Sequence, residues 1–132
     1  MLRGLNHITI AVSDLEQSLD FYTRLLGMQA HVRWDRGAYL SLGDLWICLA
    51  CDEVQPARDY SHIALDIAET DFPAFAAGLR AARVSEWKQN SSEGLSLYFL
   101  DPDGHRLEVH CGDLQSGLKT LRTGPYPGLL WL

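Results

Sequence analysis

Two stretches of the chain repeat one pattern, and each presents a histidine at the start of a predicted strand. The first runs from Leu5 to Val12 and contains His7, and the second runs from Tyr60 to Ile67 and contains His62. In each stretch the residue after the histidine is aliphatic, and so are the residues two and four positions further on. Successive side chains of a strand point to opposite faces, so the aliphatic side chains share one face and the histidine lies on the other. The repeat therefore predicts two similar units, each with a histidine on the face away from its core.

A third predicted strand, His105 to His110, repeats the arrangement with a carboxylate. Its aliphatic residues share one face, and Glu108 points the other way. A single strand histidine is usually an ordinary core or surface residue, but equivalent positions of a repeat come together in a pseudo-twofold fold. Two imidazoles and one carboxylate form the ligand set of a catalytic metal site with open positions. We predict that His7, His62 and Glu108 bind one divalent metal.

The composition indicates one enzyme-sized domain. The chain has 132 residues, of which 47% are hydrophobic, and a formal net charge of −6. This charge argues against nucleic acid or an anionic membrane as the main partner, since both need a basic face. No apolar run could span a bilayer and no signal peptide is evident, so we expect a cytoplasmic protein. Cys48, Cys51 and Cys111 are expected to be reduced thiols.

The first unit is predicted to follow the order strand, helix and three strands. Ser13 and Glu16 are placed to form a capping box, and Gly27 to end the helix in a left-handed conformation. The helix is expected over 15–26, and the later strands over 28–33, 38–42 and 45–50. The last two strands would be joined by a tight turn at Gly43 and Asp44.

The second unit is predicted to have the same order, with Thr70 capping its helix and a turn over 101–104. Its later strands are expected over 84–89, 95–100 and 105–110. We therefore predict an α+β fold of paired βαβββ modules in a single domain. The first module covers about 4–52, the second about 59–111, and a C-terminal tail covers 112–132. The short connector between the modules favours exchange of paired units between two subunits.

The face of each module away from its helix is expected to line a cleft. The residues on that face are His7, Thr9, Trp46, Cys48, His62, Tyr98 and Glu108. Cys48 is the counterpart of Glu108 in the repeat, but it lies between aliphatic residues and fits a cleft wall better than a fourth ligand. Tyr39 and Trp46 are predicted to form the other walls.

The chain resembles the vicinal-oxygen-chelate superfamily and, within it, the FosA-type fosfomycin-resistance glutathione transferases. The Asp-Pro-Asp-Gly turn is common to the superfamily, whereas Trp-Lys-Gln-Asn followed by Ser-Glu-Gly is much more specific. The matching segments are Leu5-Asn6-His7, Arg33-Trp34-Asp35, Gly37-Ala38-Tyr39-Leu40, Gly43-Asp44-Leu45-Trp46, Asp59-Tyr60-Ser61-His62, Trp87-Lys88-Gln89-Asn90, Ser92-Glu93-Gly94, Tyr98 through His105, and Pro125-Tyr126.

The resemblance implies an enzyme that opens the epoxide of fosfomycin with the thiol of glutathione, its cosubstrate. It implies Mn(II), or another divalent metal such as Zn, bound by residues matching His7, His62 and Glu108. It also implies a homodimer in which each site takes the first histidine from one subunit and the other two ligands from its partner. A potassium ion would occupy the loop matching Asn90, Ser92, Gly94 and Ser96.

The same chemistry assigns roles to other polar residues. Such a metal would act as a Lewis acid on the epoxide oxygen. Lys88 would neutralise the phosphonate, and Ser92 and Tyr98 would supply hydroxyl groups to it. Thr9, two residues beyond His7 and on its face, could reach the epoxide oxygen.

The chain departs from the family pattern at Gly117, where relatives usually carry an arginine that grips the phosphonate. Losing a bidentate guanidinium could cost about a few kcal/mol of binding. Lys119 or Arg122 could compensate. The departure raises the alternatives of slow fosfomycin turnover or another small anionic substrate.

Two other classes of protein share the superfamily fold. An iron-dependent extradiol dioxygenase would use the same ligand set with an acid/base histidine, for which His110 is the candidate. A metal-free drug-binding protein of the bleomycin-resistance type would have no need of the three ligands.

Overall fold

Each half of the chain forms a four-stranded mixed sheet with a helix packed on one face. The structure is a computed structural model that describes residues 1–91 and 93–132. They divide into a first unit, Met1–Ser61 with Leu100–His105, and a second unit, His62–Phe99 with Arg106–Leu132. The predicted α+β fold with a repeated βαβββ order is confirmed.

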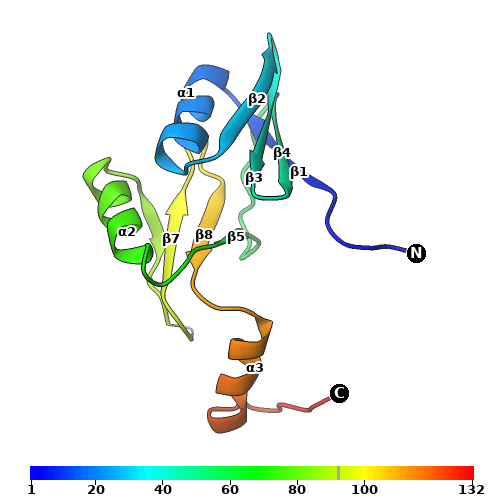
Figure 1. The fold of residues 1–132 in the computed structure, drawn as a ribbon, viewed down its shortest axis with the longest axis vertical. Helices are drawn as coiled ribbons and strands as arrows, with labels where there is room; N and C mark the ends of the chain where they lie inside the picture. Colours follow the sequence, from blue (N-terminus) through cyan, green and yellow to red (C-terminus); the bar gives the residue numbers. More distant parts are fainter. Residues whose placement is uncertain (92) are drawn as a thin grey trace. The chain divides into compact units, whose positions relative to one another are not determined.

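The first sheet has the strand order β1-β4-β3-β2, with β1 parallel to β4 and the other neighbours antiparallel. The helix α1 packs against β3 and β4 of this sheet (Figure 1), and the π-helical turn η1 continues it along the chain. Tyr22, Leu40 and Leu49 are among the fully buried side chains of this core. The bounds are β1 His7–Val12, α1 Leu15–Asp20, η1 Phe21–Leu25, β2 Gln29–Trp34, β3 Gly37–Leu42 and β4 Leu45–Cys51.

The start of α1 differs from the prediction. Asp14 caps the helix by accepting a hydrogen bond of 3.1 Å from the Gln17 backbone N–H, so the predicted Ser13–Glu16 capping box is wrong. Ser13 instead donates through its backbone and its hydroxyl to the Asp103 carboxylate. The turn over 101–104 lies in the first unit, and its Asp103 binds the residue that was expected to cap the helix. Gly27 has the predicted left-handed conformation, with φ +77°.

The second sheet has the order β5-β8-β7-β6, with β5 parallel to β8. The helix α2 lies beside β7 in Figure 1, and the Phe75 and Phe99 rings meet there at 6.3 Å. The helix begins after Asp71, so the predicted Thr70 cap is wrong, and Pro73 lies in the first turn, where it costs little. The bounds are β5 Ile63–Asp66, α2 Phe72–Ala81, β6 Glu86–Lys88, β7 Ser96–Leu100 and β8 Arg106–His110.

The predicted C-terminal tail contains a helix, α3 (Leu114–Thr123), which stands beyond the second sheet in Figure 1. Asp113 and Ser116 form a reciprocal capping box, with hydrogen bonds of 2.8 and 2.9 Å. None of the α3 side chains is buried. Among the described residues, no helix is long and apolar enough to cross a membrane.

Candidate functional site

Two of the predicted metal ligands lie side by side in the second unit. Glu108 sits in β8, which pairs in parallel with β5, and His62 immediately precedes β5. The His62 Nε2 atom is 3.0 Å from the Glu108 Oε1 atom, and Glu108 is only 6% exposed. Two atoms bound at right angles to one metal, each at about 2.1 Å, are about 3 Å apart. The pair can therefore supply two of the three predicted metal ligands without rearrangement.

The third predicted ligand, His7, belongs to the first unit. It lies exposed at the start of β1, opposite Trp46 in the β1–β4 register, with the two rings 4.4 Å apart. Its Nδ1 atom is 2.7 Å from the Asn6 side-chain oxygen. Residues 1–91 and 93–132 contain no group of three or more His, Cys, Asp or Glu side chains that could hold a metal ion.

The His7 face of the first sheet is an exposed row of aromatic rings. Trp34 lies 4.9 Å from Tyr39, and Tyr39 lies 5.0 Å from Trp46, which in turn contacts His7. Tyr39 and Trp46 are each 38% exposed. In the register, both Thr9 and Tyr39 pair with Cys48, so these residues share the face of His7. This face can supply walls for a ligand but has no charge to hold an anion.

The cation predicted to bind the phosphonate, Lys88, lies over the ring of Tyr98. Lys88 pairs with Tyr98 across β6 and β7, and its Nζ atom is 4.8 Å from the centre of the Tyr98 ring. The His62 ring lies 6.0 Å from Tyr98 and 5.3 Å from Trp87. Tyr98 is 3% exposed, and the Trp87 indole N–H donates to the Leu107 carbonyl at 3.0 Å. Lys88 and His62 therefore share the buried Tyr98 ring as a neighbour, and the ring holds the ammonium group by a cation–π contact.

The predicted potassium loop is closed by a side chain. The Asn90 amide donates to the Gly94 carbonyl at 2.8 Å, and Gly94 has φ +74°. Ser92, predicted both for this loop and for phosphonate binding, lies outside the described residues. Ser96 is nearly buried, and its hydroxyl donates to the Glu108 Oε2 atom at 2.8 Å.

Gly117 and the two cations predicted to compensate for it, Lys119 and Arg122, all lie on α3. Gly117 has open space around it, since a Cβ atom there would meet nothing within 4 Å. Lys119 is exposed, and Arg122 stacks over the Trp131 ring at 4.9 Å. Helical residues two or five positions apart do not share a face. Neither cation therefore extends from the side of α3 on which Gly117 lies.

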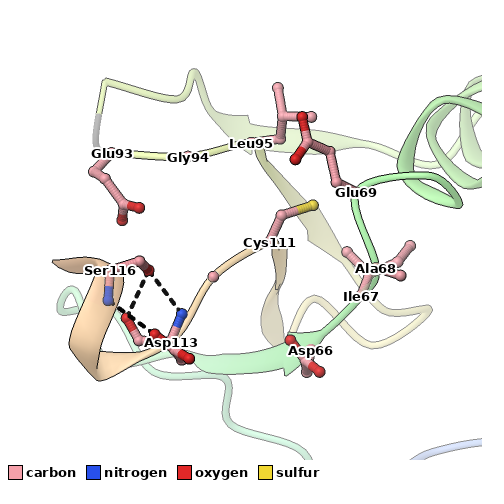
Figure 2. A pocket seen from close by; sticks show the side chains of 11 residues that line it. Asp66, Ile67, Ala68, Glu69, Glu93, Gly94, Leu95, Cys111, Asp113 and Ser116 are labelled. Carbon is pink, nitrogen blue, oxygen red and sulfur yellow. Dashed lines mark hydrogen bonds between the residues drawn. The ribbon is translucent and has the colours of Figure 1, made fainter.

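A cavity of about 640 Å³ in the second unit is lined by acidic groups (Figure 2). Asp66, Glu69, Glu93 and Asp113 contribute carboxylates, and Cys111 contributes a thiol. Burial raises the pKa of the Cys111 thiol, and the Glu69 and Asp66 charges raise it further. The thiol is thus kept protonated, and the acidic lining disfavours an anionic substrate such as a phosphonate. We assign neither the nucleophile nor the phosphonate to this cavity.

The sequence reasoning missed one connection, between Glu108, Ser96 and His110. His110 was considered only as the acid/base of a dioxygenase, yet its Nδ1 atom is 2.6 Å from the Ser96 hydroxyl oxygen. The available signal was the two-residue period, which puts Glu108 and His110 on one face of β8 and Ser96 and Tyr98 on one face of β7.

Comparison with known proteins agrees with this fold and identifies the family. The model of the Glyoxalase/Bleomycin resistance protein/Dioxygenase superfamily matches residues 4–109. Glutathione transferase FosA of Serratia marcescens is 52% identical over 136 residues, covering 99% of this chain and 96% of that protein. Metallothiol transferase FosB of Staphylococcus epidermidis is 34% identical over 126 residues, covering 90% and 91%.

A solved structure of a fosfomycin resistance protein has a similar fold. It is a mutant of the fosfomycin resistance protein FosX from Listeria monocytogenes, complexed with Mn(II) and 1S,2S-dihydroxypropylphosphonic acid. It is 29% identical, covers 90% of this chain and 99% of its own, and superposes with a TM-score of 0.79. The chain therefore belongs to the glyoxalase/bleomycin resistance protein/dioxygenase superfamily and, within it, to the family of FosA-type glutathione transferases.

Proposed function

We propose that this protein adds the thiol of glutathione to the epoxide of fosfomycin and so confers resistance to that antibiotic. The observation that carries the proposal is the His62–Glu108 pair, with donor atoms 3.0 Å apart, in a chain 52% identical to a FosA glutathione transferase. Membership of the family and the composition of the site support the same chemistry.

His62 and Glu108 are proposed to hold a divalent metal, Mn(II), together with His7 of the partner subunit. Bound there, the metal supplies Lewis-acid polarisation of the epoxide oxygen. Lys88 balances the phosphonate charge, and its position over the Tyr98 ring fixes the ammonium group. Thr9, on the face of His7, is placed to donate a hydrogen bond to the epoxide oxygen.

The nucleophile comes from the cosubstrate. The glutathione thiol loses its proton, its sulfur forms a bond to an epoxide carbon, and the bond from that carbon to the ring oxygen breaks. The oxygen takes up one proton to become a hydroxyl group, so that the thiol proton lost and the hydroxyl proton gained balance. The chain then needs no reactive cysteine, in keeping with the raised pKa of Cys111. We place the enzyme in the cytoplasm, where reduced glutathione is plentiful.

The active form is proposed to be a homodimer, with potassium in the loop containing Asn90 and Gly94. A second copy would bring a His7 face to each His62–Glu108 pair. The exposed ring row of the first sheet, with Tyr39 and Trp46 each 38% exposed, supports a surface that association covers.

The direct test is consumption of fosfomycin by the purified protein with glutathione, Mn(II) and potassium. The proposal expects formation of the glutathione adduct, and loss of that activity with chelator. Adduct formation that is absent under every metal condition, in a sample that binds Mn(II), would remove the assignment to fosfomycin.

Introducing the missing cation is expected to tighten substrate binding. Gly117→Arg should lower the KM for fosfomycin by about one to two decades, because a charge-assisted contact is worth roughly 1.5–3 kcal/mol. The open space around Gly117 accommodates the side chain. Steady-state kinetics on purified variants measures the effect.

Two control variants separate charge from helix stability. Gly117→Ala removes the helix-weakening glycine without adding charge, and Gln115→Arg adds the charge two positions away on another side of α3. Both should leave KM within about threefold of the parent value. If Lys119→Ala or Arg122→Ala raises KM while Gly117→Arg does not lower it, Lys119 or Arg122 already binds the phosphonate in place of an arginine at position 117.

A further inference from the structure

A chain of hydrogen bonds leads from Glu108 into the second sheet. The Ser96 hydroxyl donates to the Glu108 Oε2 atom at 2.8 Å, and the His110 Nδ1 atom lies 2.6 Å from the same hydroxyl oxygen. A serine hydroxyl has one proton, and here it goes to the carboxylate. The His110 Nδ1 atom must therefore carry a proton and donate to Ser96. The order of donation is His110 to Ser96 to Glu108.

The His110 ring is held in a slot bounded by two glycines. A Cβ atom at Gly94 would lie 3.2 Å from the ring Cε1 atom, and one at Gly112 would lie 3.2 Å from the Nε2 atom. Both glycines have positive φ values, +74° and +129°. A side chain at either position would push on the imidazole, so the fold fixes where the ring can be.

The far side of the ring faces the rim of the acidic cavity. The Glu93 carboxylate lies 3.7 Å from the His110 Nε2 atom. Figure 2 shows Glu93 and Gly94 on one rim of that cavity, across from Asp113 and Ser116. The ring thus spans the space between the loop after β6 and the buried carboxylate of Glu108.

The two oxygens of Glu108 consequently have different partners. Oε1 is the atom 3.0 Å from His62 Nε2, and Oε2 is the atom bonded by Ser96. Carboxylates that bind metals are commonly held by a second hydrogen bond, which fixes their rotation and raises metal affinity. Ser96 and Glu108 are 9% and 6% exposed, so water does not compete freely for these bonds.

We propose that Ser96 and His110 are positioning residues of the metal site. The donated hydrogen bond of His110 orients the Ser96 hydroxyl, and Ser96 holds Glu108 so that Oε1 stays beside His62. The inference rests on the proposed metal site, and it gives His110 a role other than acid/base catalysis.

The test measures the Mn(II) dissociation constant of the full chain by the electron paramagnetic resonance signal of free Mn(II). His110→Phe keeps a ring in the slot but removes Nδ1, and Ser96→Ala removes the hydroxyl. Each should weaken Mn(II) binding by about tenfold to a hundredfold. His110→Asn places an amide N–H near the position of Nδ1 and should stay within about threefold of the parent protein.

A matched control lies in the first sheet. The His31 Nε2 atom is 2.7 Å from the Ser41 hydroxyl oxygen, so His31→Phe breaks a similar contact without touching Glu108. It should leave Mn(II) affinity unchanged. Thermal melting of every variant without metal identifies any loss of folding, and the affinities are compared below the lowest melting temperature.

The outcomes separate this inference from the proposed function. A parent protein that does not bind Mn(II) overturns the proposed function itself. A parent protein that binds, with His110→Phe and Ser96→Ala binding equally well, overturns only the positioning role. Equal weakening by His110→Phe and His110→Asn, with both folded, also overturns it, because the role requires a donor at Nδ1. Recovery in His110→Asn alone supports it.

Discussion

A mixture of two inactive variants, His7→Ala and Glu108→Ala, is expected to recover about a quarter of the parent activity. Each variant alone should lose fosfomycin turnover by more than about a thousandfold, since a lost ligand removes several kcal/mol of transition-state stabilisation. Recovery follows from the proposed sharing of metal ligands between two subunits. In the mixed dimer, one site combines two intact ligand sets and the other combines both substitutions.

The expected fraction comes from counting dimers. Free exchange of subunits makes about half of the dimers mixed, and each mixed dimer has one complete site of its two. The measurement is adduct formation per subunit after co-expression of the two chains with different affinity tags. His7 belongs to the first unit and Glu108 to the second. Recovered activity would therefore show directly that a site takes His7 from one subunit and Glu108 from the other.

A second mixture provides the control. His62→Ala and Glu108→Ala affect two ligands of the same unit, whose side chains lie 3.0 Å apart. In that mixed dimer each site lacks one ligand, so no activity should return. Recovery in neither mixture, with dimers formed, would mean that each site takes all its ligands from one chain. Recovery in both mixtures would mean that His62 and Glu108 do not bind the same metal.

The two-residue period predicted the faces of the sheets well. It placed the aliphatic residues of β1 and β8 in the core, where Ile10, Val12, Leu107 and Val109 are buried. Alternation works because every strand has a covered and an uncovered face. The same reasoning put Glu108 and His62 on one face, and their donor atoms lie 3.0 Å apart.

The misses have a common physical cause, which is competition between partners distant in sequence. Ser13 was expected to cap α1, but Asp103 bonds it, and Asp14 caps instead. The hydrogen bond from the Ser96 hydroxyl to Glu108 was not predicted either. A short polar side chain has several partners of similar energy, and only the fold decides which of them is near.

In the turn between β7 and β8, Asp101 also binds a partner distant in sequence, Tyr22. We expect the loss of this carboxylate to have a large effect on stability. Asp101 is 5% exposed and accepts three hydrogen bonds: 2.7 Å from the Tyr22 hydroxyl, 3.0 Å from Asp103 N–H and 2.8 Å from His105 N–H. Burial and the Asp101 charge raise the pKa of Tyr22 well above its usual range, so the phenol remains a donor. The sequence identified this turn only as a common motif.

Asp101→Ala is expected to lower the free energy of unfolding by about 3–4 kcal/mol, because it leaves three donors, one of them fully buried, without an acceptor. Urea unfolding without metal, at one protein concentration, measures the change. Tyr22→Phe is the matched control: it removes one donor, leaves the two backbone bonds of Asp101, and should cost about 1–2 kcal/mol. If both variants lose the same amount, the turn's backbone bonds add nothing and the phenol alone accounts for the effect. If Asp101→Ala loses less than about 1 kcal/mol, the donors find other acceptors and the buried carboxylate does not hold the turn to the first unit.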